Sequence, residues 1–358
     1  MSKERSMVLV KPRQMEMRDF AVPGIDDGSF LLRVNLVTIC GGDPIEYEGR
    51  NVKAHYPMIL GHEMVGTIEK IGDAAARRYK VDVGDRVSVE PYILCGHCEY
   101  CLSGYYQFCT NSKIYGVNMS CETPPHLWGA YGEYLYGAPG SKVHKIDPAV
   151  PDEAAALSSV LGNGVRWVRT KARVKFGESV VVLGAGAQGL ATVIAAREAG
   201  ADPIIVVGRE ANKIKWTLAR EFGAHHLVDL DETESPLARV RELTAGRLAD
   251  VVVECTGAEA LMQLGLELVR PVGRYVMIGT CGYDRRALTT DIIVFKEIQV
   301  LGGLGQSWDT EPAVQIINRR KYPIEKMITH VFPLEQADQA LRYFMTRPDQ
   351  AVRVAIKP

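Results

Sequence analysis

The sequence predicts an α/β protein in which a mainly β region is followed by a doubly wound parallel sheet, and three observations support this class. Short β-rich segments broken by glycine and proline fill the first half of the chain. From about residue 175, apolar strands alternate with helical segments, which is typical of a parallel sheet covered on both faces. A glycine-rich turn joins the first of these strands to its helix, as it does where such sheets bind phosphate groups.

In the first half, the expected strands alternate or run apolar over residues 30–38, 64–71 and 86–90. Residues 92–140 follow as a long irregular stretch. Loops of that length are usually functional or are held by something other than a core of their own.

From about residue 175 onward, strands and helices alternate. The expected strands cover residues 179–183, 203–207, 226–230, 250–254, 274–278 and 298–301. Helical spacing is found over residues 187–199 and 213–222. The tail is expected to form two helices and a strand, over residues 311–320, 334–346 and 351–356. Because it is too short for its own core, it is expected to pack on another part of the chain.

Composition places the chain among ordinary globular proteins. Its 358 residues are 47% hydrophobic and 24% charged, and this length predicts two domains or one large one. Lys plus Arg total 42 and Asp plus Glu total 43, for a net charge of −1. A near-neutral chain does not attract nucleic acids or anionic membranes, so we expect neither as a partner. Since no apolar run approaches the roughly 20 residues that span a bilayer and no signal peptide is evident, we expect a cytoplasmic protein.

The glycine-rich turn, Gly184-Ala-Gly-Ala-Gln-Gly189, predicts a dinucleotide site. In this setting, Gly184 makes the tight turn, Gly186 lets the backbone approach a pyrophosphate, and Gly189 lets helix and strand pack closely. The phosphates are expected at the helix N-terminus. The candidate cofactor contacts in this part of the chain are Gly184, Gly186, Gln188, Gly189, Thr256 and Gly279.

The position that selects between NAD and NADP lies about twenty residues later, at Gly208-Arg209-Glu210. If Glu210 accepts the ribose hydroxyls, the site favours NAD. If Arg209 binds a 2′-phosphate, since Gly208 offers no acid, the site favours NADP. A further alternative is that Arg209 is a solvated loop residue. The sequence leaves these alternatives open, with NAD as the working expectation.

Four cysteines within fifteen residues, Cys95, Cys98, Cys101 and Cys109, predict a structural zinc site. The short gaps let the backbone wrap one tetrahedral ion, and four thiolates close its coordination shell. Disulfides are a poorer explanation without a secretion signal, and an iron–sulfur cluster is an alternative. The zinc would fasten a loop that has no core of its own.

Cys40 and the pair His62-Glu63 form a second candidate metal site. A cysteine at the end of an apolar strand is usually a core residue, and a single histidine is usually structural. Together they offer sulfur, nitrogen and oxygen donors, which fit an open zinc site with water in the remaining position.

With these motifs, the chain resembles the zinc-containing medium-chain dehydrogenase/reductase family of alcohol and polyol dehydrogenases. The resemblance covers essentially the whole chain and rests on motifs in family order: Cys40-Gly-Gly-Asp43, Gly61-His-Glu-Met-Val-Gly66, Val83-Gly-Asp-Arg-Val87, the four cysteines and the Gly184 turn. It implies a GroES-like catalytic domain over residues 1–162, with the zinc lobe at about 92–112. A Rossmann domain over residues 163–302 and a return to the catalytic domain over 303–358 complete the expected organisation. It also implies two zinc ions per chain and a homodimer or homotetramer.

By position in the family motifs, Cys40 and His62 resemble catalytic zinc ligands, and Asp43 resembles the acid that orients a ligand. Glu63 resembles a residue that ligates zinc in some members and lies behind it in others. The family's usual third ligand falls at Asn163, whose amide is a poor zinc ligand. We therefore expect Cys40, His62, Glu63 and a water, as in the polyol branch.

The family's proton relay is missing from this chain. Gly42 stands where Ser or Thr is usual, and Ile45 stands where His is common. Either Glu46, Glu63 or ordered water takes the proton, or the reaction is not ordinary alcohol oxidation.

The leading hypothesis is zinc-dependent, reversible oxidation of a secondary alcohol, with hydride transfer to a nicotinamide cofactor. If tryptophans line the pocket rather than the core, the substrate is bulky, cyclic or apolar. A second hypothesis, motivated by Gly42 and Ile45, is conjugate or iminium reduction. A third is a non-catalytic cofactor-binding relative, against which the retained metal-site residues argue. The candidate pocket residues are Trp128, Asn163, Trp167 and Trp308.

Overall fold

The computed structural model describes residues 3–209, 213–347 and 350–358, which form two compact units. The split unit comprises Met1–Ser159 and Val314–Pro358, and the central unit comprises Val160–Ala313. The boundaries expected from the sequence were 162 and 302. Two helices span the observed boundaries, α5 (Ser158–Val165) and α11 (Thr310–Asn318). Among the described residues, no helix is both long enough and apolar enough to cross a membrane.

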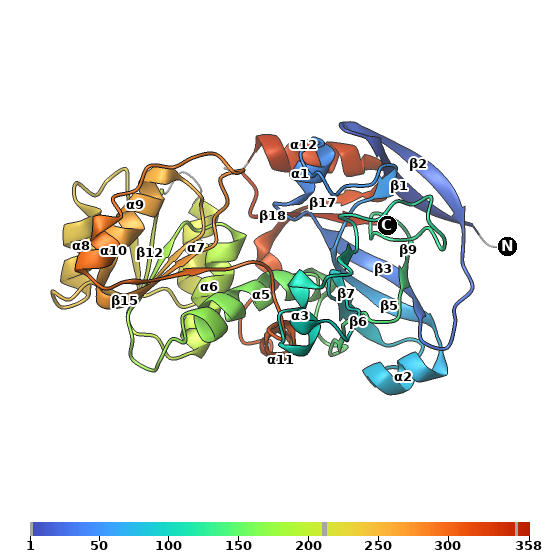
Figure 1. The fold of residues 1–358 in the computed structure, drawn as a ribbon, viewed down its shortest axis with the longest axis horizontal. Coiled ribbons are helices and arrows are strands. Elements are labelled where there is room, and N and C mark those ends of the chain that lie inside the picture. Colours follow the sequence, from blue (N-terminus) through green and yellow to red (C-terminus); the bar gives the residue numbers. More distant parts are fainter. Residues whose placement is uncertain (1–2, 210–212, 348–349) are drawn as a thin grey trace. The chain divides into compact units, whose positions relative to one another are not determined.

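The central unit is built on a six-stranded sheet in the order β13-β12-β11-β14-β15-β16. Neighbouring strands are parallel throughout, and helices lie on both sides of the sheet (Figure 1). This confirms the predicted doubly wound class. The strands are β11 (Val180–Leu183), β12 (Ile204–Gly208), β13 (His226–Asp229), β14 (Ala249–Glu254), β15 (Val269–Met277) and β16 (Gln299–Gly302). The helices are the π-helical turn η2 (Arg166–Lys171), α6 (Ala187–Glu198), α7 (Lys213–Glu221), α8 (Pro236–Leu243), α9 (Glu259–Leu268) and α10 (Asp291–Phe295).

Valine-rich strands form the middle of this sheet. Every residue of β11 and β14 is buried. Because a parallel strand covered on both faces needs apolar side chains at successive positions, runs such as Val180-Val181-Val182 become central strands. By contrast, β16 is an edge strand and is mostly exposed.

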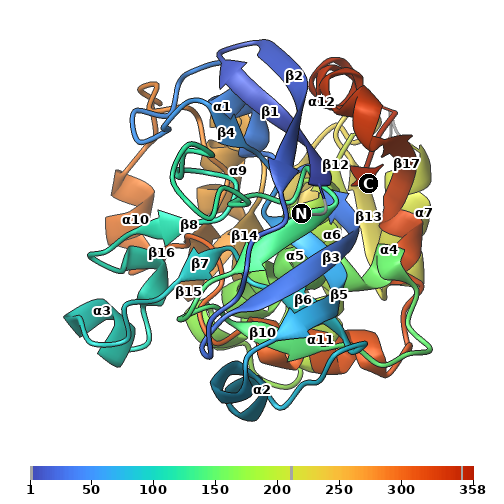
Figure 2. The same ribbon diagram turned by 90° about the vertical axis from the view of Figure 1, so that its right-hand side faces the viewer.

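The split unit contains a seven-stranded sheet, a three-stranded sheet and a two-stranded ribbon. The main sheet runs β10-β6-β5-β3-β18-β17, and β9 also pairs with β3. Figure 2 shows β3, β5 and β6 side by side. Its strands are β3 (Phe30–Thr38), β5 (Glu63–Ile71), β6 (Arg86–Val89), β9 (Tyr134–Gly137), β10 (Val143–Lys145), β17 (Ile328–Pro333) and β18 (Arg353–Lys357). The smaller sheets use β1 (Lys3–Lys11), β2 (Gln14–Ala21), β4 (Met58–Ile59), β7 (Tyr92–Ile93) and β8 (Lys113–Ile114). The helical elements are α1 (Asp43–Tyr47), α2 (Asp73–Tyr79), α3 (Glu99–Leu102), η1 (Tyr106–Phe108), α4 (Asp152–Ala155), η3 (Ile324–Met327), η4 (Leu334–Gln336) and α12 (Ala337–Thr346).

The tail of the chain adds its strands to the main sheet of the split unit. β18 lies between β3 and β17, antiparallel to the first and parallel to the second. Ala355 pairs with Thr38 and Ile356 with Val37. The last strand therefore lies beside the end of β3, immediately before Cys40.

Glu4, on β1, is a fully buried carboxyl group. Its oxygens accept hydrogen bonds from the Ser6 hydroxyl at 2.9 Å and from the Tyr134 N–H at 3.4 Å. Burial raises the pKa of Glu4 to about 7, and the negative charge of Glu133 adds to the rise. The folded state thus binds this proton more tightly than the unfolded state does.

We expect Glu4→Gln to flatten the pH dependence of stability. In the wild type, the stabilising effect of the bound proton is fully present below about pH 4.5 and is lost as the pH rises through about 7. Between pH 5 and 8, the loss amounts to roughly 2–3 kcal/mol, so the variant should be the more stable protein at pH 8. Urea unfolding at both pH values measures this, with Glu16→Gln as the exposed control on the paired strand β2. Equal losses in the wild type and Glu4→Gln would contradict the prediction.

Candidate metal and dinucleotide sites

Cys40, His62 and Glu63 come together in the split unit. Cys40 follows β3, and His62 immediately precedes β5, which begins at Glu63. β3 and β5 pair antiparallel with Thr38 opposite Glu63, so the sheet register brings the three residues together. One donor atom from each lies within 4.8 Å of the others. A thiolate, an imidazole and a carboxylate at this separation fit a zinc ion.

Asp43, in α1, contacts both Cys40 and His62 of this cluster. It is fully buried, and its Oδ2 accepts hydrogen bonds from the Cys40 N–H at 2.9 Å and the Tyr131 hydroxyl at 3.0 Å. Its Oδ1 lies 3.3 Å from Nδ1 of His62. Burial lowers the pKa of His62, but the charges of Asp43 and Cys40 outweigh burial and raise it well above its ordinary value. A carboxylate facing Nδ1 holds the proton there and leaves Nε2 as the nitrogen that can bind a metal.

Arg353, on β18, holds the carboxylate of Glu63, and both side chains are buried. Arg353 Nη1 lies 3.3 Å from Oε2, and Nη2 donates to Oε1 at 3.4 Å. The Thr38 hydroxyl also donates to Oε2, at 2.6 Å. The carboxylate of Glu63 therefore lies close both to a buried cation and to the donor atoms of Cys40 and His62. Arg353 was not among the residues predicted for the site. Its position between Val352 and Val354 in an apolar strand could have indicated a buried charge.

Glu46, also in α1, is a further buried acid near this cluster. Its Oε1 accepts a hydrogen bond from the Asn51 side chain at 2.9 Å. Burial, followed by the negative charge of Asp43, raises the pKa of Glu46 to about 7, although His62 acts in the opposite direction. A Cβ atom built at Gly42 would stand 3.9 Å from the Cys40 sulfur. This position therefore has room for the start of a Ser or Thr side chain, which this chain lacks.

The four-cysteine lobe lies between β7 and β8. The sulfurs of Cys95, Cys98, Cys101 and Cys109 lie within 4.8 Å of one another, and all four thiols are free. Backbone N–H groups of Thr110 and Cys101 lower the pKa of Cys98 to about 5, whereas burial raises that of Cys101 to about 12. Four sulfurs around one point fit a closed tetrahedral zinc site.

In the central unit, the glycine-rich turn has the geometry expected of a phosphate-binding turn. Gly184 has a φ of +95°, which favours glycine, and α6 begins directly after Gly186. A Cβ atom at Gly189 would collide with the Gly184 carbonyl oxygen, whereas one at Gly186 would meet nothing within 4 Å. The first N–H groups of α6 have no partner within the helix. Open backbone at this helix end fits a pyrophosphate.

The other candidate cofactor contacts lie at the ends of central strands. Gly208 ends β12, and Arg209 after it pairs with Asp231 at 3.6 Å, both side chains being exposed. Thr256 and Gly279 follow β14 and β15. Glu210 lies outside the described residues. Gln188, in α6, accepts a hydrogen bond from the indole N–H of Trp167 at 3.4 Å.

The tryptophans proposed for the pocket differ in exposure. Trp128 belongs to the core of the split unit, where it packs edge-on against Tyr136 and donates to the Thr123 carbonyl at 2.8 Å. Trp167 is only 2% exposed, whereas 54% of Trp308 is exposed. Asn163, in α5, is half-buried. Trp308 is thus the most exposed of these three tryptophans.

Comparison with known proteins gives two family matches. The profile described as the alcohol dehydrogenase GroES-like domain matches residues 26–148, and the profile described as zinc-binding dehydrogenase matches residues 187–319. Together they cover parts of both units.

Similar proteins extend over nearly the whole chain. A probable alcohol dehydrogenase of Mycobacterium tuberculosis is 37% identical over 347 residues, which cover 94% of this chain and 93% of that one. An erythritol/L-threitol dehydrogenase of Mycolicibacterium smegmatis is 31% identical, covering 99% and 98% of the two chains. A short chain alcohol dehydrogenase of Escherichia coli CFT073, solved with NADH, has a TM-score of 0.85 at 25% identity and covers 100% of both chains.

Proposed function

The chain belongs to the zinc-containing medium-chain dehydrogenase/reductase family, and from that premise we propose that it oxidises a secondary alcohol reversibly, with a nicotinamide dinucleotide as hydride acceptor. The observation that carries the proposal is the cluster of Cys40, His62 and Glu63 backed by Asp43. When bound there, zinc supplies a Lewis acid that lowers the pKa of an alcohol hydroxyl. The related erythritol/L-threitol dehydrogenase supports an alcohol substrate.

In this mechanism, the residues of the chain orient donors and hold protons. Asp43, whose Oδ1 lies 3.3 Å from Nδ1 of His62, favours the proton on that nitrogen and leaves Nε2 to bind zinc. Thr38 and Arg353 hold the carboxylate of Glu63 at a fixed place. For the alcohol proton, we propose Glu46 as the acceptor, because it is a buried carboxyl whose pKa of about 7 suits proton exchange near neutral pH.

We propose Glu63 as the third protein donor at this site, with the four cysteines holding a second zinc ion. One oxygen of Glu63 lies within 4.8 Å of the sulfur of Cys40 and the ring nitrogen of His62. Oε1 is the more available oxygen, since Arg353 at 3.4 Å is its one hydrogen-bond donor among the described residues. Two zinc ions per chain is therefore the expected metal content.

For the cofactor we propose NAD rather than NADP. Arg209, the residue that would bind a 2′-phosphate, is already paired with Asp231. The proposal of an apolar or cyclic substrate rests on the candidate pocket residue Trp308, which is 54% exposed, whereas buried Trp128 and Trp167 lend no support.

A substrate panel with both oxidised cofactors tests this function. We expect turnover of cyclic secondary alcohols such as cyclohexanol with NAD+, less with erythritol, and little with NADP+. Cyclohexenone with NADH is the discriminating member, because reduction of its C=C bond in place of carbonyl reduction would overturn the proposal. Absence of turnover with every alcohol, in protein containing two zinc ions, would also overturn it.

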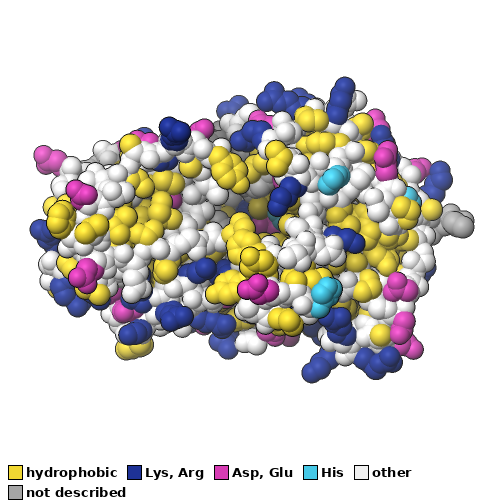
Figure 3. All heavy atoms as spheres, viewed as in Figure 1, with side chains coloured by type: hydrophobic (Ala, Val, Ile, Leu, Met, Phe, Trp, Pro, Cys, Tyr) yellow, Lys and Arg dark blue, Asp and Glu magenta, His cyan; other side chains and the backbone are white. Residues whose placement is uncertain are grey.

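We further propose a homo-oligomer in which a second copy covers the edge of the central sheet. β16 leaves one side of its backbone unpaired in the described residues, and Val300 within it is 41% exposed. Val294 and Phe295, at the end of α10, are 70% and 85% exposed. Apolar side chains also lie at the surface around α10 (Figure 3). Exposed apolar edges of this kind are normally covered. Sedimentation equilibrium measures the state, and a monomer would contradict this proposal.

A further inference from the structure

Three loops meet at the carboxyl ends of β11, β14 and β15, the adjacent strands of the central sheet. The Gly184 turn follows β11, the segment Thr256-Gly257 follows β14, and Gly279 follows β15. In doubly wound sheets, ligands bind at these strand ends. The way these loops are held together therefore bears on cofactor binding.

Direct contacts join the three loops. A Cβ atom on Gly184 would stand 2.5 Å from the Thr256 methyl group, so Thr256 lies directly against the first glycine of the turn. A Cβ on Gly279 would collide with the backbone nitrogen of Gly257. The segment Thr256-Gly257 is thus wedged between the other two loops.

Glu254, the last residue of β14, holds this segment in place. It is completely buried. Its Oε1 accepts hydrogen bonds from the Thr256 N–H at 2.6 Å, from the Thr256 hydroxyl and from the Gly257 N–H at 3.0 Å. Its backbone carbonyl accepts from the N–H groups of Ile278 and Gly279, at 3.0 and 3.1 Å. One residue therefore connects the loops after β14 and β15.

Among the residues that the structure describes, the side chain of Glu254 is held by hydrogen-bond donors and not by a cation. Within residues 3–209, 213–347 and 350–358, no ion pair includes it, and its side-chain partners are the N–H and hydroxyl groups named above. A buried carboxylate depends strongly on such donors, and each bond to a charged group is stronger than one between neutral groups. The conformation of Thr256-Gly257 is consequently tied to the carboxylate.

We infer that Glu254 is a positioning residue for the dinucleotide: its carboxylate fixes Thr256-Gly257 against the Gly184 turn and Gly279, and so shapes the cofactor pocket without touching the cofactor. The inference rests on the proposed dehydrogenase function. It assigns a role in cofactor affinity to a residue that family motifs and metal chemistry leave unexplained.

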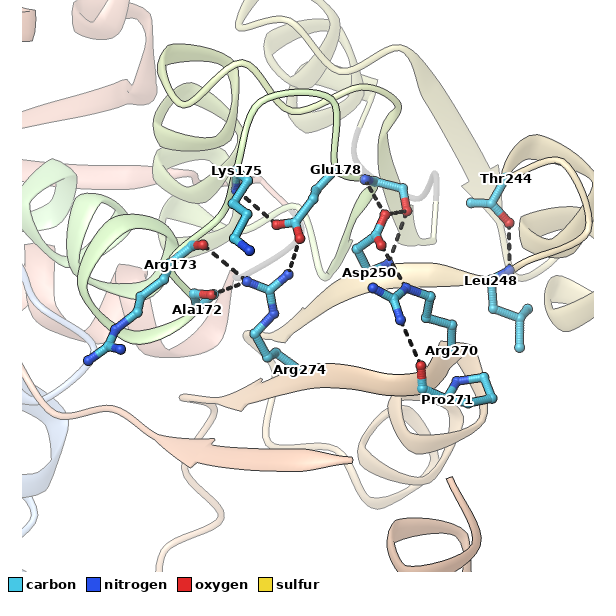
Figure 4. Close-up of polar contacts among 11 residues, drawn as sticks. Ala172, Arg173, Lys175, Glu178, Thr244, Leu248, Asp250, Arg270, Pro271 and Arg274 are labelled. Atoms are coloured by element: carbon cyan, nitrogen blue, oxygen red, sulfur yellow. Dashed lines mark hydrogen bonds and ion pairs between the residues drawn. The ribbon is translucent and has the colours of Figure 1, made fainter. Parts of the chain in front are cut away.

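Asp250 provides a matched control at the opposite end of the same strand. It is also a buried carboxylate, and its Oδ2 accepts from the Ser179 N–H at 2.8 Å, while Arg270 donates to Oδ1 at 2.6 Å. Figure 4 shows Asp250 with Arg270, near the ion pair of Arg274 with Glu178. Loss of either carboxylate is expected to destabilise the central unit, but only that of Glu254 lies at the cofactor end.

The test measures binding of NADH and NADPH to the purified, zinc-loaded protein by calorimetry. In Glu254→Gln, the Kd of the preferred nucleotide is expected to rise roughly tenfold, a loss of about 1.4 kcal/mol. KM for the cofactor should rise by a similar factor, while KM for the alcohol changes by less than about twofold. In Asp250→Asn, the thermal midpoint should fall while the Kd stays at the wild-type value.

Two outcomes would overturn the inference that Glu254 positions the cofactor loops. An unchanged Kd in Glu254→Gln overturns the inference, and so does an equal rise in Asp250→Asn, because the effect would then be general destabilisation. If Glu254→Gln does not fold, Thr256→Val decides instead: it keeps the methyl group, removes one donor to Glu254 and should raise the Kd roughly threefold, and an unchanged Kd there also overturns the inference. A wild-type protein that binds neither nucleotide would refute the proposed function itself.

Discussion

In Cys40→Ala, kcat/KM for the alcohol is expected to fall at least about a thousandfold, equivalent to about 4 kcal/mol of transition-state stabilisation. The substitution removes the thiolate from the three-donor cluster. The backbone should keep its place, because Asp43 binds the N–H of Cys40 and not its sulfur. The Kd for NADH should stay within about twofold of the wild-type value, because the nucleotide is expected to bind at the glycine turn after β11.

Metal analysis of the same variant separates loss of zinc from loss of fold. We expect two zinc ions per wild-type chain and one in Cys40→Ala. Cys121→Ala is the matched control, since Cys121 is a buried thiol of the same unit that belongs to neither metal cluster. That variant should keep both ions and full turnover. Wild-type turnover in Cys40→Ala would remove the metal cluster from the proposed mechanism.

The second large effect is expected in Cys98→Ser, which should lower the free energy of unfolding by about 4 kcal/mol or more through loss of the structural zinc. Cys98 is the informative choice because its sulfur is stabilised as a thiolate and is only partly buried. Its replacement therefore removes a ligand and leaves no large cavity, whereas Cys101 is a buried residue of the lobe.

Loss of this zinc should also destabilise the main sheet, because Tyr106 links the lobe to it. This lobe residue is buried, and its hydroxyl donates to Glu90 at 2.6 Å, while the other oxygen of Glu90 lies 2.7 Å from Nε2 of His144 on β10. Thermal unfolding and limited proteolysis between residues 95 and 113 measure the effect. A variant that keeps the wild-type midpoint and resists cleavage would show that the lobe does not depend on metal.

The central sheet could be predicted well because its strands carry their own signal. The run Val180–Leu183 is apolar at successive positions and is followed by glycine and a helical pattern, which together specify a central parallel strand. The hairpin of β1 and β2 had no such signal, since buried Glu4 and Ser6 interrupt the apolar pattern. Strand β17 was missed because its residues are half-buried or exposed.

The candidate site was predictable to the extent that its chemistry lies in short motifs. The four-cysteine spacing identified one cluster, and adjacent His62 and Glu63 indicated part of the other. Arg353 could not be found in this way. A buried charge is stabilised by its partners. The hydrogen bond of Arg353 to Glu63 joins residues 290 positions apart. Only the folded sheet brings such pairs together.

The placement of β18 has a consequence for biosynthesis. The strand that carries Arg353 is inserted between β3 and β17, and its side chain neutralises Glu63 beside Cys40. On the ribosome, Cys40, His62 and Glu63 emerge long before Arg353 does, so the buried carboxylate of Glu63 lacks its cation until the last strand has been made. The surroundings of Glu63 are therefore complete only after β18 has joined the sheet.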